Sequence, residues 1–322
     1  MDWDIHFKQN TMKHINSITF SIIIISLFAC KNNIEINRQD NAEKLEINLS
    51  GSIQNPAFSP DGKTIIFTNF RKGYNKPPSD LYTYNIETKE LKELIADGSS
   101  NVNLPGECWN GTLKSILFSS DREPHDEIFR IPENGTTGDE IKITNRQDSV
   151  AFEPTFSPDG TQIVFESHKL DEEKNGVITK YKLDGTSGYR MLTPLGEDCK
   201  QPNWSPNGDK ILYQKEENGQ WDIWIMNTDG TEKTKITNFE GSKTDAVFTS
   251  DGQYIIFSSD YGVEFANIYK TPVSGGSQTR LTNYEGYDGA PAISPDGKTL
   301  IFESSEKDPD KSKGTSLWIL KL

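Results

Sequence analysis

Short apolar segments alternate with polar turns along most of the chain, and one arrangement of them recurs. In its clearest form, Pro-Ala-Phe at residues 56–58 leads into Ser-Pro-Asp-Gly at 59–62, and Thr-Ile-Ile-Phe follows at 64–67. Apolar segments this short, rich in β-branched and aromatic residues and bounded by turn formers, predict strands joined in hairpins. Further copies lie at residues 154–160, 202–208, 248–252 and 291–297, and a sixth without the turn residues lies at 109–113.

The Ser-Pro-Asp-Gly sequence suits a type I turn that ends in a left-handed residue. Serine is favoured at the first turn position, proline fixes φ at the second, and aspartate tolerates the third. Glycine adopts the left-handed conformation at the fourth position without steric cost. This combination is the three-residue hairpin connection with a bulge, so each repeat is expected to open with a hairpin.

The spacing of the copies predicts the architecture. The apolar residue before each turn stands at position 58, 109, 156, 204, 248 or 293, which gives successive differences of 51, 47, 48, 44 and 45. A period in this range with strand-like content is typical of a β-propeller in which each repeat forms one blade.

The two ends of the chain complement each other. Every earlier repeat contains a second hairpin, whereas the sixth has one further strand, at residues 316–320, and then the chain ends. Residues 44–49 alternate between polar and apolar and predict a strand near the N-terminus. We therefore expect an all-β protein, a six-bladed β-propeller with four antiparallel strands per blade. Its sixth blade is expected to combine residues 292–322 with the N-terminal strand, which removes exposed sheet edges.

The Ser-Pro-Asp-Gly turns, the Ile-x-Phe segments that follow them and the Asp-Ile-Trp strand at 222–224 together resemble the TolB-like, WD-repeat-like β-propeller family. The resemblance covers residues 44–322. It implies the propeller fold, but related blades serve TolB proteins, sensors, lipoproteins, and the propeller parts of prolyl peptidases and oligogalacturonate lyases.

The first 43 residues predict a targeting segment and a tether. Lys13 and His14 precede an apolar run at 18–29, which is shorter than a comfortable membrane span and typical of a signal peptide. Its end, Leu-Phe-Ala-Cys30, resembles a bacterial lipobox, which implies cleavage before Cys30 and lipid attachment to its sulfur. The alternative is a secretory peptide with an incidental cysteine, and the sequence offers two possible starts, Met1 and Met12. Residues 31–43 are polar and predict a flexible tether.

Charge narrows the possible partners. The formal net charge of −14 argues against nucleic-acid binding, because neutralising phosphates requires a basic surface. We expect a monomer of the bacterial cell envelope that is anchored to the outer membrane by lipid on Cys30. The propeller is expected to face either the periplasm or the cell surface. Cys108 and Cys199 fall in repeats that are two blades apart, so no disulfide is expected between them.

Catalytic motifs are absent from the sequence. A prolyl peptidase needs a Gly-x-Ser-x-Gly elbow, which does not occur. Beyond residue 30 the histidines are His125 and His168, in different repeats, so no histidine metal cluster is expected. The sequence therefore predicts a protein without enzymatic activity and without a required cofactor.

One polar set remains as a candidate binding site. The segments that enter the first strand of each blade face the central channel in propellers, and four of their residues are carboxylates. The set comprises Gln54, Asn55, Glu107, Glu153, Gln201, Asp245 and Asp288. Converging oxygens suit calcium or the basic groups of a partner peptide, and the alternative is that each is separately solvated or paired with backbone amides.

Aromatic residues in or beside loops are the second candidate set. Trp221, Tyr261, Tyr284 and Tyr287 are the residues expected to make surface contacts. Taken together, the sequence favours a non-catalytic envelope lipoprotein whose propeller is a protein-interaction scaffold. The alternative is an envelope propeller that binds or cleaves carbohydrate, with carboxylates and aromatics gathered at one mouth of the channel.

Overall fold

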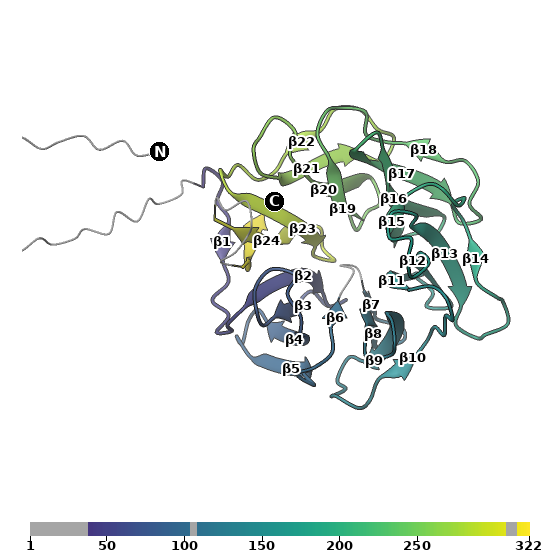
Figure 1. The fold of residues 1–322 in the computed structure, drawn as a ribbon. Helices are drawn as coiled ribbons and strands as arrows, with labels where there is room; N and C mark the ends of the chain where they lie inside the picture. The colour runs from purple at the N-terminus through teal and green to yellow at the C-terminus, as the bar shows by residue number, and fades with distance from the viewer. Residues whose placement is uncertain (1–37, 104–107, 307–313) are drawn as a thin grey trace, which may run out of the picture. The chain divides into compact units, whose positions relative to one another are not determined.

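Six antiparallel sheets stand around a common centre, as Figure 1 shows. The computed structural model describes residues 38–103, 108–306 and 314–322. Within these ranges all regular elements are strands, and no helix is long and apolar enough to cross a membrane. The predicted all-β, six-bladed propeller is confirmed, and the sheets are called blades 1 to 6 in chain order.

Each blade runs from an innermost to an outermost strand. Blade 1 contains β2 (Ser52–Phe58), β3 (Thr64–Phe70), β4 (Ser79–Asn85) and β5 (Leu91–Ile95). Blade 2 contains β6 (Val102–Asn103) and β7 (Trp109–Asn110), which both pair with β8 (Ser115–Ser120), then β9 (Glu127–Pro132) and β10 (Ile141–Lys142). Blade 3 contains β11 (Phe152–Phe156), β12 (Gln162–Ser167), β13 (Val177–Lys182) and β14 (Arg190–Met191).

The second half of the ring repeats this order. Blade 4 contains β15 (Cys199–Trp204), β16 (Lys210–Glu217), β17 (Gln220–Asn227) and β18 (Thr234–Lys235). Blade 5 contains β19 (Lys243–Phe248), β20 (Tyr254–Ser259), β21 (Asn267–Pro272) and β22 (Thr279–Arg280). Blade 6 contains β23 (Tyr287–Ile293), β24 (Thr299–Ser305), β25 (Ser316–Lys321) and, at its outer edge, β1 (Glu43–Lys44).

The recurring turn has the predicted conformation. In blade 1 the Gly62 N–H donates to the Ser59 carbonyl at 2.8 Å, and the Ser59 hydroxyl accepts the Thr64 N–H at 3.0 Å and donates to Asp61 at 2.6 Å. The five turn glycines have φ between 68° and 79°, the left-handed region in which a side chain is costly. The motif therefore fixes the hairpin between the first two strands of each blade.

The apolar core is divided into six clusters, each shared by two neighbouring blades. Between blades 1 and 2, for example, Ile66 and Leu81 pack with Ile116 and Phe118, all without measurable exposure. Because each blade contributes one face to each of two clusters, a blade buries its apolar surface only inside the ring. Cys108 and Cys199 are buried in different clusters and form no disulfide with each other.

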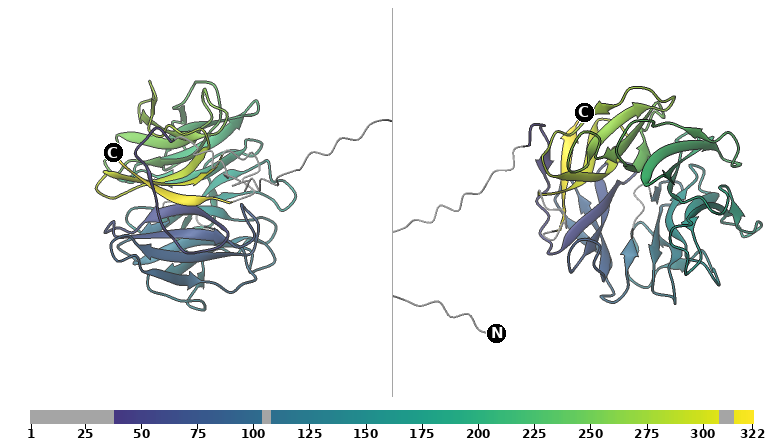
Figure 2. Two further views of the ribbon diagram at one scale, coloured as in Figure 1. Left: turned by 90° about the vertical axis from the view of Figure 1, so that its left-hand side faces the viewer. Right: turned by 45° about the horizontal axis from the view of Figure 1, so that its top comes forward.

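The N-terminal segment closes blade 6, but over fewer residues than predicted. β1 pairs antiparallel with β25, and the Leu45 N–H continues the ladder to the Leu317 carbonyl at 2.9 Å. Beyond this point the N–H groups of Ile47 and Leu49 bond locally, each to the carbonyl two residues before. The predicted strand at 44–49 is wrong in this respect, because the chain must leave the outer edge and turn inward to reach β2. Figure 2 shows this segment beside the yellow C-terminal strands.

The alternation of polar and apolar residues at 44–49 nevertheless indicates which side chains pack against the core. The side chains of Leu45, Ile47 and Leu49 pack against the cluster between blades 6 and 1. Residues 31–43 are predicted to be a flexible tether, but in the structure Arg38 bonds to Asp288 of blade 6, Asp40 accepts the Asn283 N–H from the loop before that blade, and Glu43 lies in β1. Cys30 and the predicted signal peptide lie outside the described residues.

Candidate functional site

The innermost strands carry a repeated irregularity at the centre of the ring. In blades 1, 3, 4, 5 and 6 the pairing of the first two strands shifts at one residue, which lies three positions before the last apolar residue of the inner strand. These residues have positive φ and are Asn55 (51°), Glu153 (49°), Gln201 (49°), Asp245 (54°) and Ala290 (45°). Such a bulge re-aims a side chain, and here it directs these positions toward the channel.

A left-handed conformation costs a non-glycine residue about 1 kcal/mol, so something must hold these positions. Hydrogen bonds between blades do so. The Gln201 N–H donates to Glu153 Oε2 at 2.9 Å, and the Asp245 N–H donates to Gln201 Oε1 at 2.9 Å. The Gln201 side-chain amide also donates to Asp245 Oδ1 at 2.9 Å. The side chains of Glu153 and Gln201 therefore each bind the backbone of the next blade.

Glu303 on β24 plays the same part between blades 6 and 1. Its carboxylate accepts the Asn55 N–H at 3.2 Å and the hydroxyl of Tyr287 at 3.1 Å, and the Tyr74 hydroxyl lies 3.4 Å away. Asn55 in turn donates from its side chain to Asn103 of blade 2 at 2.8 Å. The carboxylates of the channel are thus partly structural, as the alternative reading of the sequence anticipated.

These residues enclose a cavity of about 180 Å³ to which all six blades contribute. Its acidic groups are Glu153, Asp245 and Glu303, and none of its described lining residues is lysine, arginine or histidine. The lining consists of Gln54, Asn55, Tyr74, Asn75, Asn103, Glu153, Gln201, Asn203, Asp245, Ala246, Val247, Tyr287, Ala290, Pro291 and Glu303. We call this space the axial cavity.

A second cavity, of about 340 Å³, lies toward the other end of the inner strands. Aromatic residues and prolines from the recurring turns line it, among them Phe58, Trp109, Phe156 and Trp204. Asn203 borders both cavities. The axis of the propeller therefore offers an acidic, hydrogen-bonding space at one end and, at the other, a space lined by aromatic residues, prolines and serines.

Burial and neighbouring charge alter the titration of the axial groups. Burial raises the pKa of Glu153 from its ordinary 4.5 to about 8, and the nearby carboxyl of Glu166 adds to this, against the hydrogen bonds from Gln201. Burial also raises the pKa of Tyr287 well above its usual range, as do Glu303 and Tyr74. The tyrosine hydroxyls therefore stay protonated and available as donors at neutral pH.

Replacing Glu153 with glutamine is expected to stabilise the protein at pH 8 by on the order of 1–3 kcal/mol. The folded-state pKa of about 8 exceeds the ordinary 4.5, so the unfolded chain releases this proton first as pH rises. The stability that protonated Glu153 contributes is then fully present below about pH 4.5 and is lost as pH rises toward 8. Urea unfolding at pH 5 and pH 8 measures this, with the exposed Glu232→Gln as control. A Glu153→Gln chain that keeps the full wild-type pH dependence would contradict the assignment.

The structure brings together most of the predicted channel residues. Gln54, Asn55, Glu153, Gln201 and Asp245 all line the axial cavity. Glu107 lies outside the described residues.

Asp288 was placed in the channel by its sequence position, and this is wrong. It lies two positions before the bulge of β23, where the inner strands face the neighbouring blade, and its carboxylate is buried against Arg38.

The predicted surface aromatics divide into three groups. Tyr287 lines the axial cavity and bonds to Glu303, so its prediction as a surface residue is wrong. Tyr284 is 8% exposed and packs against Arg38, so its assignment to the surface is also wrong. Trp221 is half-buried with Lys200 over its ring, and Tyr261 is 38% exposed; neither lines the axial cavity.

The cavity also contains residues that sequence reasoning missed, chiefly Tyr74 and Glu303. A signal for Glu303 existed, because Phe-Glu-Ser occurs twice, at 165–167 and 302–304, each time directly after apolar residues in the second strand of a blade. An acidic residue in such a strand needs a buried partner. Tyr74 lies in the connection between β3 and β4, and nothing in the sequence directs it to the axis.

Acidic groups of this kind could also bind a metal ion. Among the described residues no three side chains of histidine, cysteine, aspartate or glutamate lie close enough together to hold a metal ion. Calcium binding in the channel stays a prediction, and these contacts add no support for it.

Comparisons with known proteins agree with this geometry. A family model described as TolB beta propeller domain matches residues 22–220 and 196–315. The Tol-Pal system protein TolB of Francisella tularensis subsp. mediasiatica (strain FSC147) is 28% identical over 212 residues, which are 66% of this chain and 44% of that protein. The chain therefore spans less than half the length of this relative.

Solved structures share the fold at low sequence identity. A putative TolB from Agrobacterium tumefaciens superposes with a TM-score of 0.59 at 23% identity, over 70% of this chain and 77% of that one. An oligogalacturonate lyase in complex with manganese superposes with a TM-score of 0.54 at 16% identity, over 84% and 77% of the two chains. Proteins named TolB and a lyase thus share this architecture, so function must be argued from the site.

Proposed function

Because this chain belongs to the TolB beta propeller family, we propose that it is a non-catalytic protein of the bacterial cell envelope whose propeller is a docking scaffold for a protein partner. The proposal includes the predicted lipid anchor at Cys30 and a location in the periplasm or at the outer membrane. Its support is the family and the character of the axial cavity.

The acidity of the axial cavity is the observation that carries the proposal. Asp245 and Glu303 face it, Glu153 adds a carboxyl group whose pKa is raised to about 8, and no described lining residue supplies a positive charge. Converging carboxylates in a concave, low-dielectric site attract cations and donors. A volume of about 180 Å³ is comparable to that of one long side chain. The cavity therefore suits a lysine or arginine side chain presented by a partner's loop or extended segment.

A second candidate is carbohydrate binding, and one observation favours it. The rings of Tyr74 and Tyr287 meet edge to face, with centroids 6.5 Å apart, and both line the cavity that holds the carboxylates. Aromatic rings beside carboxylates and amides also suit a sugar. The described residues include no metal cluster of the kind a metal-dependent lyase requires, so binding is favoured over cleavage for this candidate.

The test is an in-cell crosslink and pull-down of the full chain, read by mass spectrometry. Asp245→Asn removes one axial charge, and Asp171→Asn makes the same change on an exposed loop outside the cavity. We expect the wild type and Asp171→Asn to recover the same envelope protein, and Asp245→Asn to recover several-fold less.

The same preparations check the lipid anchor, since fatty-acid label is expected on the wild type and absent from Cys30→Ala. Equal recovery of the partner by Asp245→Asn would overturn the role of the axial cavity. Recovery of glycan fragments without a protein would transfer support to the carbohydrate candidate.

A further inference from the structure

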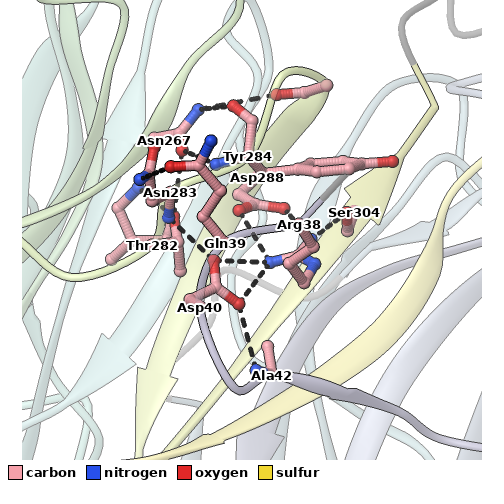
Figure 3. Close-up of polar contacts among 12 residues, drawn as sticks. Arg38, Gln39, Asp40, Ala42, Asn267, Thr282, Asn283, Tyr284, Asp288 and Ser304 are labelled. Carbon is pink, nitrogen blue, oxygen red and sulfur yellow. Dashed lines mark hydrogen bonds and ion pairs between the residues drawn. The ribbon is translucent and has the colours of Figure 1, made fainter. Parts of the chain in front are cut away.

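Among residues 38–49, Arg38 has the most side-chain hydrogen bonds, and Figure 3 shows its surroundings. Its guanidinium donates to both carboxylate oxygens of Asp288, at 2.7 and 3.2 Å, and to the Ser304 hydroxyl at 2.9 Å. The side chains of Arg38 and Asp288 are 8% and 0% exposed. A forked, charge-assisted pair of this kind is specific for a planar guanidinium.

Aromatic faces complete the surroundings of Arg38. Its Cζ lies 4.2 Å from the ring centroid of Tyr284 and 4.4 Å from that of Trp318. Stacking on aromatic rings is a property of arginine that lysine does not share in the same geometry. We call the site made by Tyr284, Asp288, Ser304 and Trp318 the arginine slot.

The backbone beside Arg38 is bound as a peptide ligand would be. The Gln39 N–H donates to the Asn283 carbonyl at 2.8 Å, and the Asn283 N–H donates to Asp40 Oδ2 at 2.7 Å. The Asn283 side chain also donates to the Gln39 side chain at 2.8 Å. Recognition therefore uses an arginine, an aspartate two residues later and the main chain between them.

Blade 5 holds Tyr284 of the slot through bonds that do not involve the segment. The Asn267 side chain donates to the Tyr284 carbonyl at 3.1 Å and accepts the Tyr284 N–H at 2.9 Å. Arg280 donates to the same asparagine at 2.8 Å. Since none of these bonds involves residues 38–44, they can hold Tyr284 in place when the segment is absent.

The segment is attached in a way that permits its release. The β1 pairing spans two exposed residues, whereas the apolar anchors Leu45, Ile47 and Leu49 follow it in the chain. Residues 38–44 can leave while these anchors stay. Space for a guest lies alongside, because a cavity of about 310 Å³ bordered by Gln39, Asn283 and Tyr284 adjoins the segment.

We propose that the arginine slot is an exchangeable binding site for an extended segment of a partner protein that carries arginine and, two residues later, aspartate. In this chain residues 38–42 occupy it in cis, and a guest segment of the same chemistry displaces them. The site is separate from the axial cavity and does not depend on the function proposed for it.

The buried carboxylate of Asp288 favours an occupant of the slot that carries a positive charge. Burial raises the pKa of Asp288, and the guanidinium of Arg38 opposes this rise. When the segment leaves, the buried carboxylate loses its counter-charge, which is unfavourable. An arginine-bearing guest restores the charge balance, while a neutral segment does not.

The test uses the full chain with Arg38→Ala, which empties the slot, and a labelled, N-acetylated peptide of residues 38–44. Fluorescence anisotropy is expected to show the peptide binding Arg38→Ala at least roughly tenfold more tightly than the wild type, whose slot is filled. A peptide with lysine in place of the arginine is expected to bind roughly tenfold more weakly. Adding Asp288→Asn to Arg38→Ala is expected to abolish binding.

A second variant covers the case in which Arg38→Ala does not fold. Arg38→Lys keeps a positive charge beside Asp288 but loses the fork, so the peptide is expected to displace its own segment more readily than that of the wild type. Equal binding by wild type and variants, or binding that ignores Asp288→Asn or the arginine-to-lysine change in the peptide, would overturn the proposal.

Discussion

Replacement of Asp222 by alanine is expected to destabilise the propeller by about 3–5 kcal/mol, because it leaves a buried lysine without its counter-charge. Lys243 is 0% exposed, and its ammonium lies 2.9 Å from Asp222 Oδ1 and contacts the Phe239 carbonyl. Thermal unfolding is expected to show a decrease in Tm of roughly 10 °C.

The same aspartate organises more than one neighbour. It also accepts from Lys235 at 2.8 Å and from the Thr237 hydroxyl at 2.9 Å. Burial acts to raise the pKa of Asp222, but the bonds from Lys235, Lys243 and Thr237 outweigh it, so the pKa is lowered. Its contribution to stability is therefore present above the ordinary carboxyl pKa and is lost as pH falls through the folded-state value.

A double variant separates lost charge balance from lost packing. Asp222→Ala combined with Lys243→Met removes both ions and is expected to be clearly more stable than Asp222→Ala alone. The exposed pair of Lys63 and Glu87, 4.0 Å apart, is the control, and Glu87→Ala is expected to change stability by less than about 0.5 kcal/mol. An Asp222→Ala chain as stable as the wild type would show that the buried pair is dispensable.

Removal of residues 38–49 is expected to have a comparable or larger effect, at least about 5 kcal/mol. The deletion takes away Arg38, which balances the buried Asp288, and the half-buried side chains of Leu45, Ile47 and Leu49. It also exposes the edge of β25 (Ser316–Lys321), which invites association with another chain. Tm is expected to fall by roughly 10–20 °C.

The matched control is a chain that begins at Arg38, which keeps every contact of the closing segment and is expected to melt like the full chain. Size-exclusion chromatography reports whether the chain without residues 38–49 associates through the open edge. If the two truncated chains melt at the same temperature, closure by the N-terminal segment does not stabilise the ring.

The arrangement of blades could be predicted from the sequence because short stretches of neighbouring residues determine it. A Ser-Pro-Asp-Gly turn needs nothing from the rest of the chain to favour its hairpin, and Gly62 requires its left-handed conformation wherever the blade stands. Since the turn recurs at nearly constant spacing, blade number and strand order follow. The alternation at 44–49 likewise reported which side chains face the core, although hydrogen bonding along that segment did not follow.

Only some of the channel residues could be predicted from the sequence. Position along the inner strand identified Glu153, Gln201 and Asp245, because the bulge stands at the same distance from the turn in each blade. It failed for Asp288, two positions earlier, because a bulge changes which side of the strand a residue faces. In this chain the sequence marks a bulge only by the proline that often follows it.

The sequence by itself thus determined the number of blades, the hairpins within them and the closure of the ring by its two ends, since short-range turn chemistry and strand periodicity specify these. Only the tertiary structure decided which polar groups meet. Glu303 joins Asn55, and Arg38 enters its slot beside Asp288, from positions about 250 residues apart. Contacts at such separation depend on how the ring closes, and no local pattern of residues encodes their geometry.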